Sequence, residues 1–240
     1  METQKIKSEG ALRINKYLAT AGLCSRREAD KLIEKGKVFI NGRRARLGDT
    51  VNPEDTVEVD HKPVKADLKK IYIAFHKPYG VITTTNRESE NNIMEYIDLP
   101  QRVFPVGRLD VHSSGLILLT NDGDIVNQVL KAEHKQEKEY MVNVDKSLTP
   151  EMILQLERGV IVEGRKTLPA KVKKISDRQF TIVIVQGLNR QVRQMCEKMG
   201  YNVTILKRIR IAGIELGDLP RGKWRVLTAK EIASLKGNKA

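Results

Sequence analysis

The most constraining feature of this sequence is a short polar and basic stretch, residues 62–70, which separates two segments of different character. The segment before it carries two helix-like patterns, whereas the segment after it is rich in strand-like patterns. Proline and charged residues favour an exposed connection over a packed element. We therefore expect domains over residues 12–61 and 71–228, joined by this linker. Residues 1–11 are expected to be a flexible tail, and residues 229–240 a basic C-terminal tail.

The first segment has clear helix signals. Apolar residues recur at helical spacing over residues 14–21, which predicts one helix. Ser25 and Glu28 form a capping-box pattern that begins a second helix, and Gly36 suits its end. The Asn-Gly pair at 41–42 predicts a tight hairpin turn, because both residues tolerate positive φ. The segment is thus expected to be a compact module of two helices and short strands.

The second segment alternates strands and helices without a regular βαβ rhythm, which favours an α+β fold on a mainly antiparallel sheet flanked by helices. Strands are expected at residues 72–75, 80–84, 115–120, 139–144, 171–175, 179–185 and 203–211. Helices are expected at about residues 92–97, 124–132, 150–158 and 190–199.

Charge indicates the class of partner. A formal net charge of +13, with Lys and Arg spread along the chain, favours a polyanion, and nucleic acid first. Arg26 and Arg27 open the second helix, where the helix dipole disfavours cations, so a phosphate could compensate; an ordinary solvated face explains the same charges. The chain shows neither a spanning apolar run nor an N-terminal apolar signal, so a cytoplasmic protein is expected. Two widely spaced cysteines make a zinc cluster or disulfide framework implausible.

A second helix start repeats the charge anomaly. Asn189 is expected to cap a helix whose first turn contains Arg190 and Arg193. Cations at this end of a helix predict a carboxylate or phosphate facing them, with a structural salt bridge as the alternative.

The polar loop at residues 106–114 precedes an apolar strand, a usual place for chemistry. Arg108 is close enough along the chain to keep Asp110 ionised, although an Asp in a loop is most often a turn former. His112 and Ser113 suggest a hydrolase, but neighbours in sequence cannot adopt triad geometry and no GxSxG elbow is present. Tyr140 lies on a predicted strand, where a core role is the default.

Three of these motifs occur in the order of a known enzyme family: Gly107-Arg108-Leu109-Asp110, Lys138-Glu139-Tyr140 and Asn189-Arg190-Gln191-Val192-Arg193. Together they resemble bacterial pseudouridine synthases of the RsuA/RluF type, which act on ribosomal RNA. Within this group they look most similar to the enzymes for large-subunit ribosomal RNA. The two-helix module resembles the S4 RNA-binding domain that this group carries at its N-terminus.

The resemblance implies an α+β catalytic domain with its catalytic loop in a basic cleft. It implies Asp110 as the catalytic carboxylate, Tyr140 as the active-site tyrosine, Arg193 as the basic partner of the carboxylate and Arg108 as support for the loop. Many relatives have His where this chain has Arg190, a residue suited to phosphate contact. The expected RNA-binding residues are Arg13, Lys16, Arg26, Arg27, Lys31, Arg43, Arg44 and Arg190.

The implied reaction isomerises a uridine in structured RNA, with large-subunit ribosomal RNA as the first expected substrate and transfer RNA as a second. It involves no redox change, so neither a cofactor nor a metal is expected, and a monomer is usual in the resembled group. Two rival hypotheses remain: a non-enzymatic S4 protein that binds ribosomal RNA, and an enzyme that transfers glycosyl groups on free nucleosides. An Asp110→Asn variant separates the first rival from a synthase, and a test of free uridine as substrate separates the second.

Overall fold

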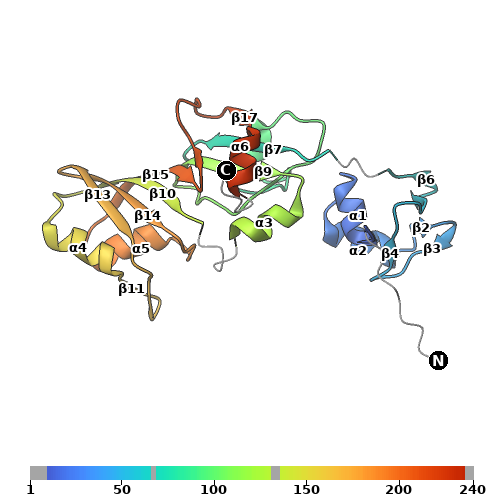
Figure 1. Cartoon of the computed structure of the whole chain (residues 1–240), viewed down its shortest axis with the longest axis horizontal. Coiled ribbons are helices and arrows are strands. Elements are labelled where there is room, and N and C mark those ends of the chain that lie inside the picture. Colours follow the sequence, from blue (N-terminus) through green and yellow to red (C-terminus); the bar gives the residue numbers. More distant parts are fainter. Residues whose placement is uncertain (1–9, 66–68, 131–135, 236–240) are drawn as a thin grey trace. The chain divides into compact units, whose positions relative to one another are not determined.

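A computed structural model describes residues 10–65, 69–130 and 136–235 (Figure 1). The chain divides into two compact units. One unit contains the chain up to Lys70 together with Pro100–Arg102, and the other contains Ile71–Leu99 and all residues from Val103. The expected tail over residues 1–9 and the linker residues 66–68 lie outside the described part.

The N-terminal unit packs two helices against short strands around one apolar core that includes Ile14, Leu18 and Val38. Strands β3, β2, β5 and β6 form an antiparallel sheet in that order, and β1 pairs with β4. The elements are β1 (Leu12–Arg13), α1 (Ile14–Thr20), α2 (Arg26–Glu34), β2 (Val38–Ile40), β3 (Arg43–Arg44), β4 (Thr50–Val51), β5 (Val57–Val59) and β6 (Lys62–Pro63).

Local sequence signals in this unit are confirmed. The Ser25 side chain accepts from the Glu28 amide, and the Glu28 carboxylate accepts from the Ser25 amide, at 3.2 and 2.6 Å. Asn41 and Gly42 both have positive φ at the turn between β2 and β3. The structure differs at the end of the unit, where Lys62–Pro63 is strand β6 rather than linker, because it pairs with β5.

The second unit is built on a nine-stranded sheet whose main path is β13-β14-β10-β15-β9-β7-β17. All its pairings are antiparallel except β15 with β9, so the expected mainly antiparallel sheet is confirmed. The strands are β7 (Tyr72–Lys77), β8 (Phe104–Pro105), β9 (Ser114–Thr120), β10 (Lys138–Val144), β13 (Lys171–Ser176), β14 (Gln179–Ile184), β15 (Val203–Ile211), β16 (Ile214–Glu215) and β17 (Trp224–Val226). A separate hairpin joins β11 (Ile161–Val162) to β12 (Arg165–Lys166).

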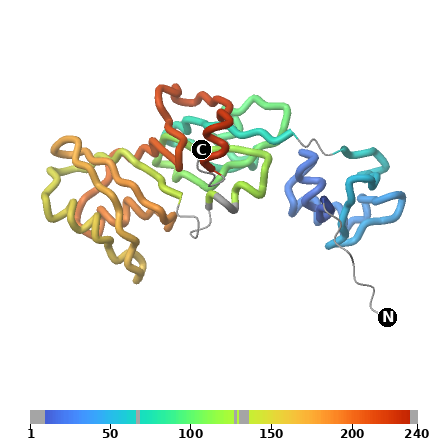
Figure 2. Tube along the Cα trace, viewed as in Figure 1, coloured from blue at the N-terminus to red at the C-terminus, as the bar shows by residue number. Residues whose placement is uncertain are grey.

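Helices cover this sheet in two groups. Helices α4 (Pro150–Arg158) and α5 (Gln191–Lys198) pack at the β13–β14 end, and α3 (Gly123–Leu130) contacts α6 (Ala229–Leu235) elsewhere (Figures 1 and 2). Two apolar clusters result, one around Phe75, Tyr140 and Phe180, the other around Leu116 and Ile125. None of the described helices is long and apolar enough to cross a membrane.

Several sequence predictions for this unit are wrong. Residues 80–84 form no strand and contribute only one bridge, from Ile82 to Asn92, and the helix expected at 92–97 is a 3-10 turn, η1 (Ile93–Tyr96). The expected tail begins instead as helix α6, because Leu235 is buried in the core. The short edge strand β17 was not predicted, since three residues carry little pattern.

Candidate active site

The loop between β8 and β9 contains Asp110 and is held along its backbone. Thr83 exchanges hydrogen bonds with both backbone groups of Leu109, donating to its carbonyl at 2.7 Å. The Gly80 amide donates to the Val111 carbonyl at 2.8 Å, and the Ser113 amide donates to the Asp110 carbonyl at 3.0 Å. The position of the Asp110 backbone is therefore set by contacts on both sides of it.

Lys77 adds an unusual contact to this loop. Its side chain is fully buried, and its ammonium donates to the carbonyls of Pro78 and Ser113 at 2.9 and 2.8 Å. Burial lowers the pKa of Lys77 to about 8, against the attraction of Asp110. Burying an ammonium without a carboxylate partner costs free energy. Here the buried ammonium fixes the end of the loop through its two carbonyl contacts. Sequence reasoning missed Lys77, because a Lys at the end of a strand has no distinctive pattern.

Arg193 holds the same loop from α5. Its guanidinium donates from Nη2 to the His112 carbonyl, and from Nη1 to the Val203 carbonyl at 2.9 Å. Burial lowers its pKa, Arg190 lowers it further, and Asp110 raises it. Among the described residues Asp110 and Arg193 make no ion pair. The expected direct contact is absent: Nη1 and Nη2 bind backbone carbonyls, and the buried Nε has no hydrogen-bond partner among the described residues.

Helix α5 begins differently from the expectation. Arg190, not Asn189, is the N-cap residue; it has a left-handed φ of 46° and makes no side-chain cap hydrogen bond. The Gln191 side chain instead accepts from the Leu188 amide at 3.2 Å. A left-handed conformation is uncommon for a residue with a side chain and clusters at functional sites. The Arg190 side chain is exposed, lies 3.6 Å from Glu197, and lines the same cavity as the Asp110 loop.

A cavity of about 630 Å³ lies against these elements, within the usual size range of small-molecule sites. Asp110, Arg108, Tyr140 and Arg190 all line it, so the structure brings four of the predicted residues together. Arg193 is not among the lining residues and acts from behind the loop. The Arg108 side chain is exposed and makes no hydrogen bond with the described loop, so its predicted supporting role has no contact to rest on.

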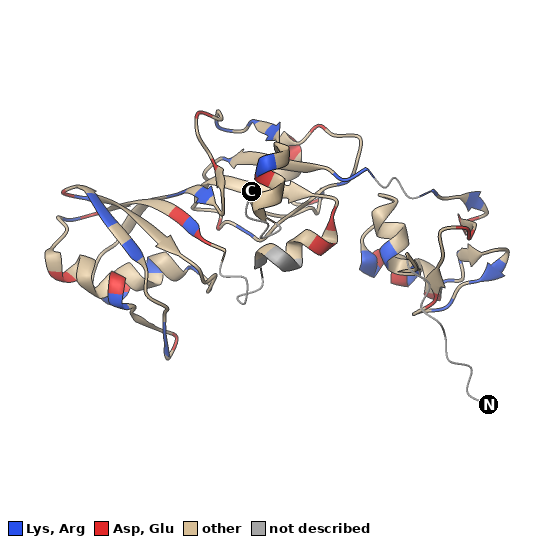
Figure 3. Cartoon of the chain, in the orientation of Figure 1, with Lys and Arg blue, Asp and Glu red and all other residues tan. Residues whose placement is uncertain are grey.

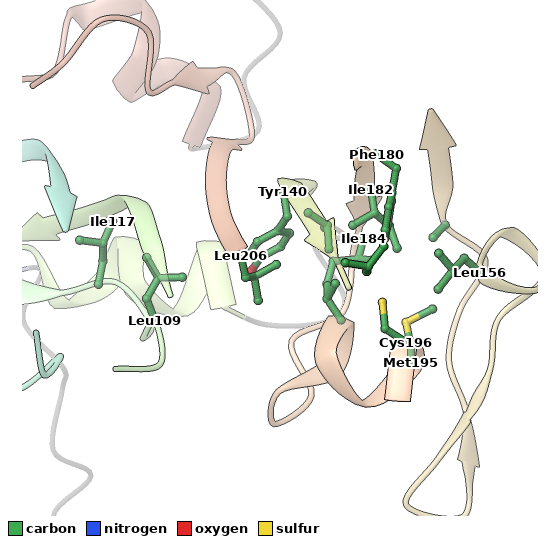
Figure 4. Packing of buried hydrophobic residues seen from close by; sticks show 14 of the residues in the cluster. Leu109, Ile117, Tyr140, Leu156, Phe180, Ile182, Ile184, Met195, Cys196 and Leu206 are labelled. Carbon is green, nitrogen blue, oxygen red and sulfur yellow. The ribbon is translucent and has the colours of Figure 1, made fainter. Parts of the chain in front are cut away.

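Tyr140 forms part of the cavity wall from the middle of the sheet. Its ring is buried in the main apolar cluster with Leu206, and Figure 4 shows the two side chains next to each other. Tyr140 and Val142 share the buried face of β10, as their alternation predicted. Arg208 lies opposite Tyr140 on β15, with its guanidinium carbon 6.0 Å from the ring centre.

The lining also contains residues that sequence reasoning did not select. Lys138, at the start of β10, and Arg208 both face the cavity, as does the buried Ser113. Lys138 was quoted only as part of a motif, and Arg208 belongs to a strand with alternating charges that resembles an ordinary surface. Their proximity arises from strand pairing that no local pattern encodes.

The predicted RNA-binding residues of the N-terminal unit are mostly exposed. Arg26, Arg27 and Lys31 lie on α2, where Arg26 reaches the Asn15 side chain at 3.5 Å. Arg43 pairs with Asp49 at 2.8 Å. The remaining predicted residues of this set are the exposed Arg13 and Arg44 and the half-buried Lys16. Figure 3 marks the positions of Lys and Arg residues on both units of the chain.

A loop carboxylate, a buried tyrosine and several cations around one cavity suit a reaction on a nucleic-acid base. Among the described residues no group of His, Cys, Asp or Glu could hold a metal ion. The RNA pseudouridylate synthase family model matches residues 71–198, and the S4 domain model matches residues 12–57. The chain belongs to the pseudouridine synthase family. Its N-terminal unit is an S4 domain, and its second unit is the catalytic domain.

Relatives support this assignment along nearly the whole chain. The dual-specificity RNA pseudouridine synthase RluF of Escherichia coli K12 is 47% identical over 231 residues, which cover 95% of this chain and 79% of that protein. The ribosomal large subunit pseudouridine synthase B of Bacillus subtilis is 38% identical and matches 93% of this chain and 95% of that protein. A crystal structure of a pseudouridylate synthase matches 93% of this chain and 99% of that chain, with a TM-score of 0.70 and 28% identity.

Proposed function

We propose that this pseudouridine synthase modifies a uridine in large-subunit ribosomal RNA and a uridine in transfer RNA, with Asp110 as the catalytic carboxylate. The observation that carries the assignment of Asp110 is its place in the cavity. It is the one carboxylate among the described lining residues, and its side chain makes no hydrogen bond or ion pair with the described part of the chain. A carboxylate left free in a basic cavity is available to react with a substrate.

The reaction breaks the C1′–N1 bond of uridine, turns the uracil, joins C5 to C1′ and removes the proton from C5. Asp110 serves as nucleophile or base toward the ribose. Arg193 and Lys77 hold the Asp110 loop through the carbonyls of His112 and Ser113 and place positive charge near the carboxylate. Tyr140 packs against the base and assists the final deprotonation.

The target uridine must leave its stack to reach Asp110, at a cost of about a few kcal/mol. The S4 domain offsets this cost by binding phosphates and RNA shape through its exposed arginines. Dual specificity is proposed from the printed name of the Escherichia coli relative, and the large-subunit target also agrees with the name of the Bacillus subtilis relative. An RNA substrate of this kind supports a cytoplasmic location, and we expect the active form to be a monomer, which size-exclusion chromatography would test.

The direct test uses ribosomal and transfer RNA from a strain that lacks the enzyme. Purified protein is added, and pseudouridines are mapped at nucleotide resolution in both RNA classes. We expect at least one new pseudouridine in large-subunit ribosomal RNA and one in transfer RNA. Modification of ribosomal RNA alone would contradict dual specificity, and no modification of either class would contradict the proposed function. Free uridine is the control substrate and should remain unchanged.

A further inference from the structure

The cavity carries more positive charge than its single carboxylate requires. Four cations line it, namely Arg108, Lys138, Arg190 and Arg208, against Asp110 alone. Uridine itself is neutral, so the base and ribose do not account for this excess. Arg108 and Arg190 are exposed, and Arg190 has an ion-pair partner, so the unexplained charges are those of Lys138 and Arg208. Charged side chains are expensive to bury or half-bury without a partner, which indicates that an anion enters with the substrate.

Arg208 is a buried residue of this lining whose hydrogen-bond donors are not all satisfied. It is only 3% exposed, and its Nε donates to the Leu116 carbonyl at 2.7 Å. Its Nη2 is buried without a hydrogen-bond partner among the described residues. Buried donors are paired in the large majority of cases, so an orphaned guanidinium nitrogen in a cavity wall calls for an explanation.

Lys138 lies on the same side of the sheet. Lys138 and Tyr140 alternate along β10 and so share one face, and Arg208 is the cross-strand neighbour of Tyr140 on β15. The Lys138 ammonium uses one of its donors on the Gln136 carbonyl at 3.2 Å. No carboxylate pairs with Lys138 or Arg208 in the described part of the chain. Burial lowers the pKa of Lys138, and the neighbouring Arg208 lowers it further.

By contrast, the next arginine on the strand is fully neutralised. Arg210 donates to Glu139 at 2.8 Å and to Glu137 at 3.0 Å, and it does not line the cavity. The chain thus supplies acidic partners for a guanidinium where it needs them on β15. The lack of an acidic partner for Arg208 and Lys138 is therefore specific to residues that line the cavity.

We propose that Lys138 and Arg208 form an anion subsite within the active-site cavity that receives a phosphate of the target nucleotide. The proposal rests on the proposed function, since it concerns the same cavity and the same substrate. A phosphate offers several acceptor oxygens, enough for Arg208 Nη2 and the free donors of the Lys138 ammonium. The subsite would anchor the backbone of the flipped nucleotide while Asp110 reaches its ribose.

The test measures binding of uridine, uridine 5′-monophosphate and uridine 3′-monophosphate to the full chain by NMR titration at fixed ionic strength. We expect at least one monophosphate to bind about tenfold or more tightly than uridine, as charge-assisted hydrogen bonds would give. Arg208→Gln and Lys138→Gln should each remove most of this preference. Arg208→Lys and Lys138→Arg should restore part of it. Inorganic phosphate should compete with the monophosphate in the unmodified chain and not in Arg208→Gln.

Lys207→Gln is the matched control, because it removes one positive charge from the same strand at a residue that does not line the cavity. It should keep the preference for the monophosphate. If Arg208→Gln fails to fold after losing its bond to Leu116, Lys138→Gln carries the test. An unmodified chain with no preference, or Gln variants that retain it, would overturn the subsite.

Pseudouridine formation on RNA, measured in parallel, separates the two proposals. An active enzyme without a phosphate preference contradicts the subsite alone. An inactive enzyme whose phosphate preference depends on Lys138 and Arg208 contradicts the proposed function and keeps an anion site.

Discussion

Gly115 joins the catalytic loop to the sheet at a point with no room for a side chain. It is the second residue of β9, has a φ of 107°, and pairs in parallel with Arg208. A Cβ built there would lie 2.2 Å from the Arg208 carbonyl oxygen and 2.6 Å from its amide nitrogen. The sequence predicted a strand here, but it could not predict this approach, because the two residues are far apart in the chain.

Gly115→Ala should therefore destabilise the catalytic domain. Strain at a positive φ costs about 1–3 kcal/mol by itself, and the contact with the backbone of β15 adds to it. We expect a loss of about 3 kcal/mol or more in the free energy of unfolding, measured by urea denaturation. Gly123→Ala is the control, since a Cβ at Gly123 meets nothing within 4 Å. Equal stability of the two variants would show that the close approach is not required.

Lys77 makes a pH-dependent contribution to stability that follows from its buried position. Its pKa is lowered to about 8, so the unfolded chain binds more protons than the folded chain between about pH 8 and the ordinary lysine value near 10.4. The cost of burying the charge is present in full below pH 8 and is relieved as the pH rises. The stability of the protein relative to Lys77→Met should thus increase over this window, by up to about 3 kcal/mol.

Urea denaturation of both proteins at several pH values measures this difference. Comparison with Lys77→Met cancels the titration of other groups. The Lys77→Met substitution also removes two hydrogen bonds to carbonyls. Their loss changes the free energy of unfolding by the same amount at every pH, so the slope of stability against pH is unaffected. If the stability difference between the two proteins stays constant or falls between pH 8 and 10, the pKa of the buried Lys77 ammonium is not lowered.

At the scale of elements, sequence reasoning succeeded where the signal is local. Helix α2 has its capping box, and strand β10 has its alternation of buried and partly buried residues. It failed where contacts between residues far apart in the sequence determine the local structure. Residues 80–84 have strand-like composition but are used to hold the catalytic loop, through the Gly80 amide and the Thr83 hydroxyl. The start of α5 was misjudged because the left-handed conformation of Arg190 has no sequence signature.

Helix α2 gives a test of the RNA-binding surface. Its first two residues, Arg26 and Arg27, are exposed at a helix N-terminus, where phosphates bind well. Changing both to Ala should weaken RNA binding and reduce the slope of log affinity against log salt by roughly 1–2, as expected for two lost phosphate contacts. Turnover at saturating RNA should be unaffected. Binding is measured by filter retention at several salt concentrations.

The control is the pair Arg165 and Lys166, which is equally exposed on the β11–β12 hairpin and absent from the cavity lining. Replacing these two with Ala removes the same charge and should change the salt slope less. An unchanged slope for the α2 variant, or a loss of turnover at saturation, would contradict the role assigned to this helix.

At the scale of the whole molecule, the chain combines an RNA-binding S4 domain with a catalytic domain whose cavity is basic. Three ordered motifs, together with a two-helix module that resembles an S4 domain, were enough to predict this combination. They also predicted Asp110, Arg108, Tyr140 and Arg190 as site residues, all of which line the cavity, but not Lys138, Ser113 and Arg208. They did not predict how the loop is held: Arg193 and Lys77 bind its carbonyls, and the Asp110 carboxylate makes no hydrogen bond or ion pair with the described residues.

The central claim is that this free carboxylate performs the chemistry. Asp110→Asn keeps the size of the side chain and removes its charge, so the loop contacts and the S4 domain should be preserved. Asp177→Asn, at an exposed turn carboxylate, is the matched control. The measurement is the rate of pseudouridine formation at saturating RNA, together with RNA affinity. We predict a loss of at least about 10²–10⁴-fold in rate for Asp110→Asn with affinity nearly unchanged. Retained activity in Asp110→Asn would contradict the account.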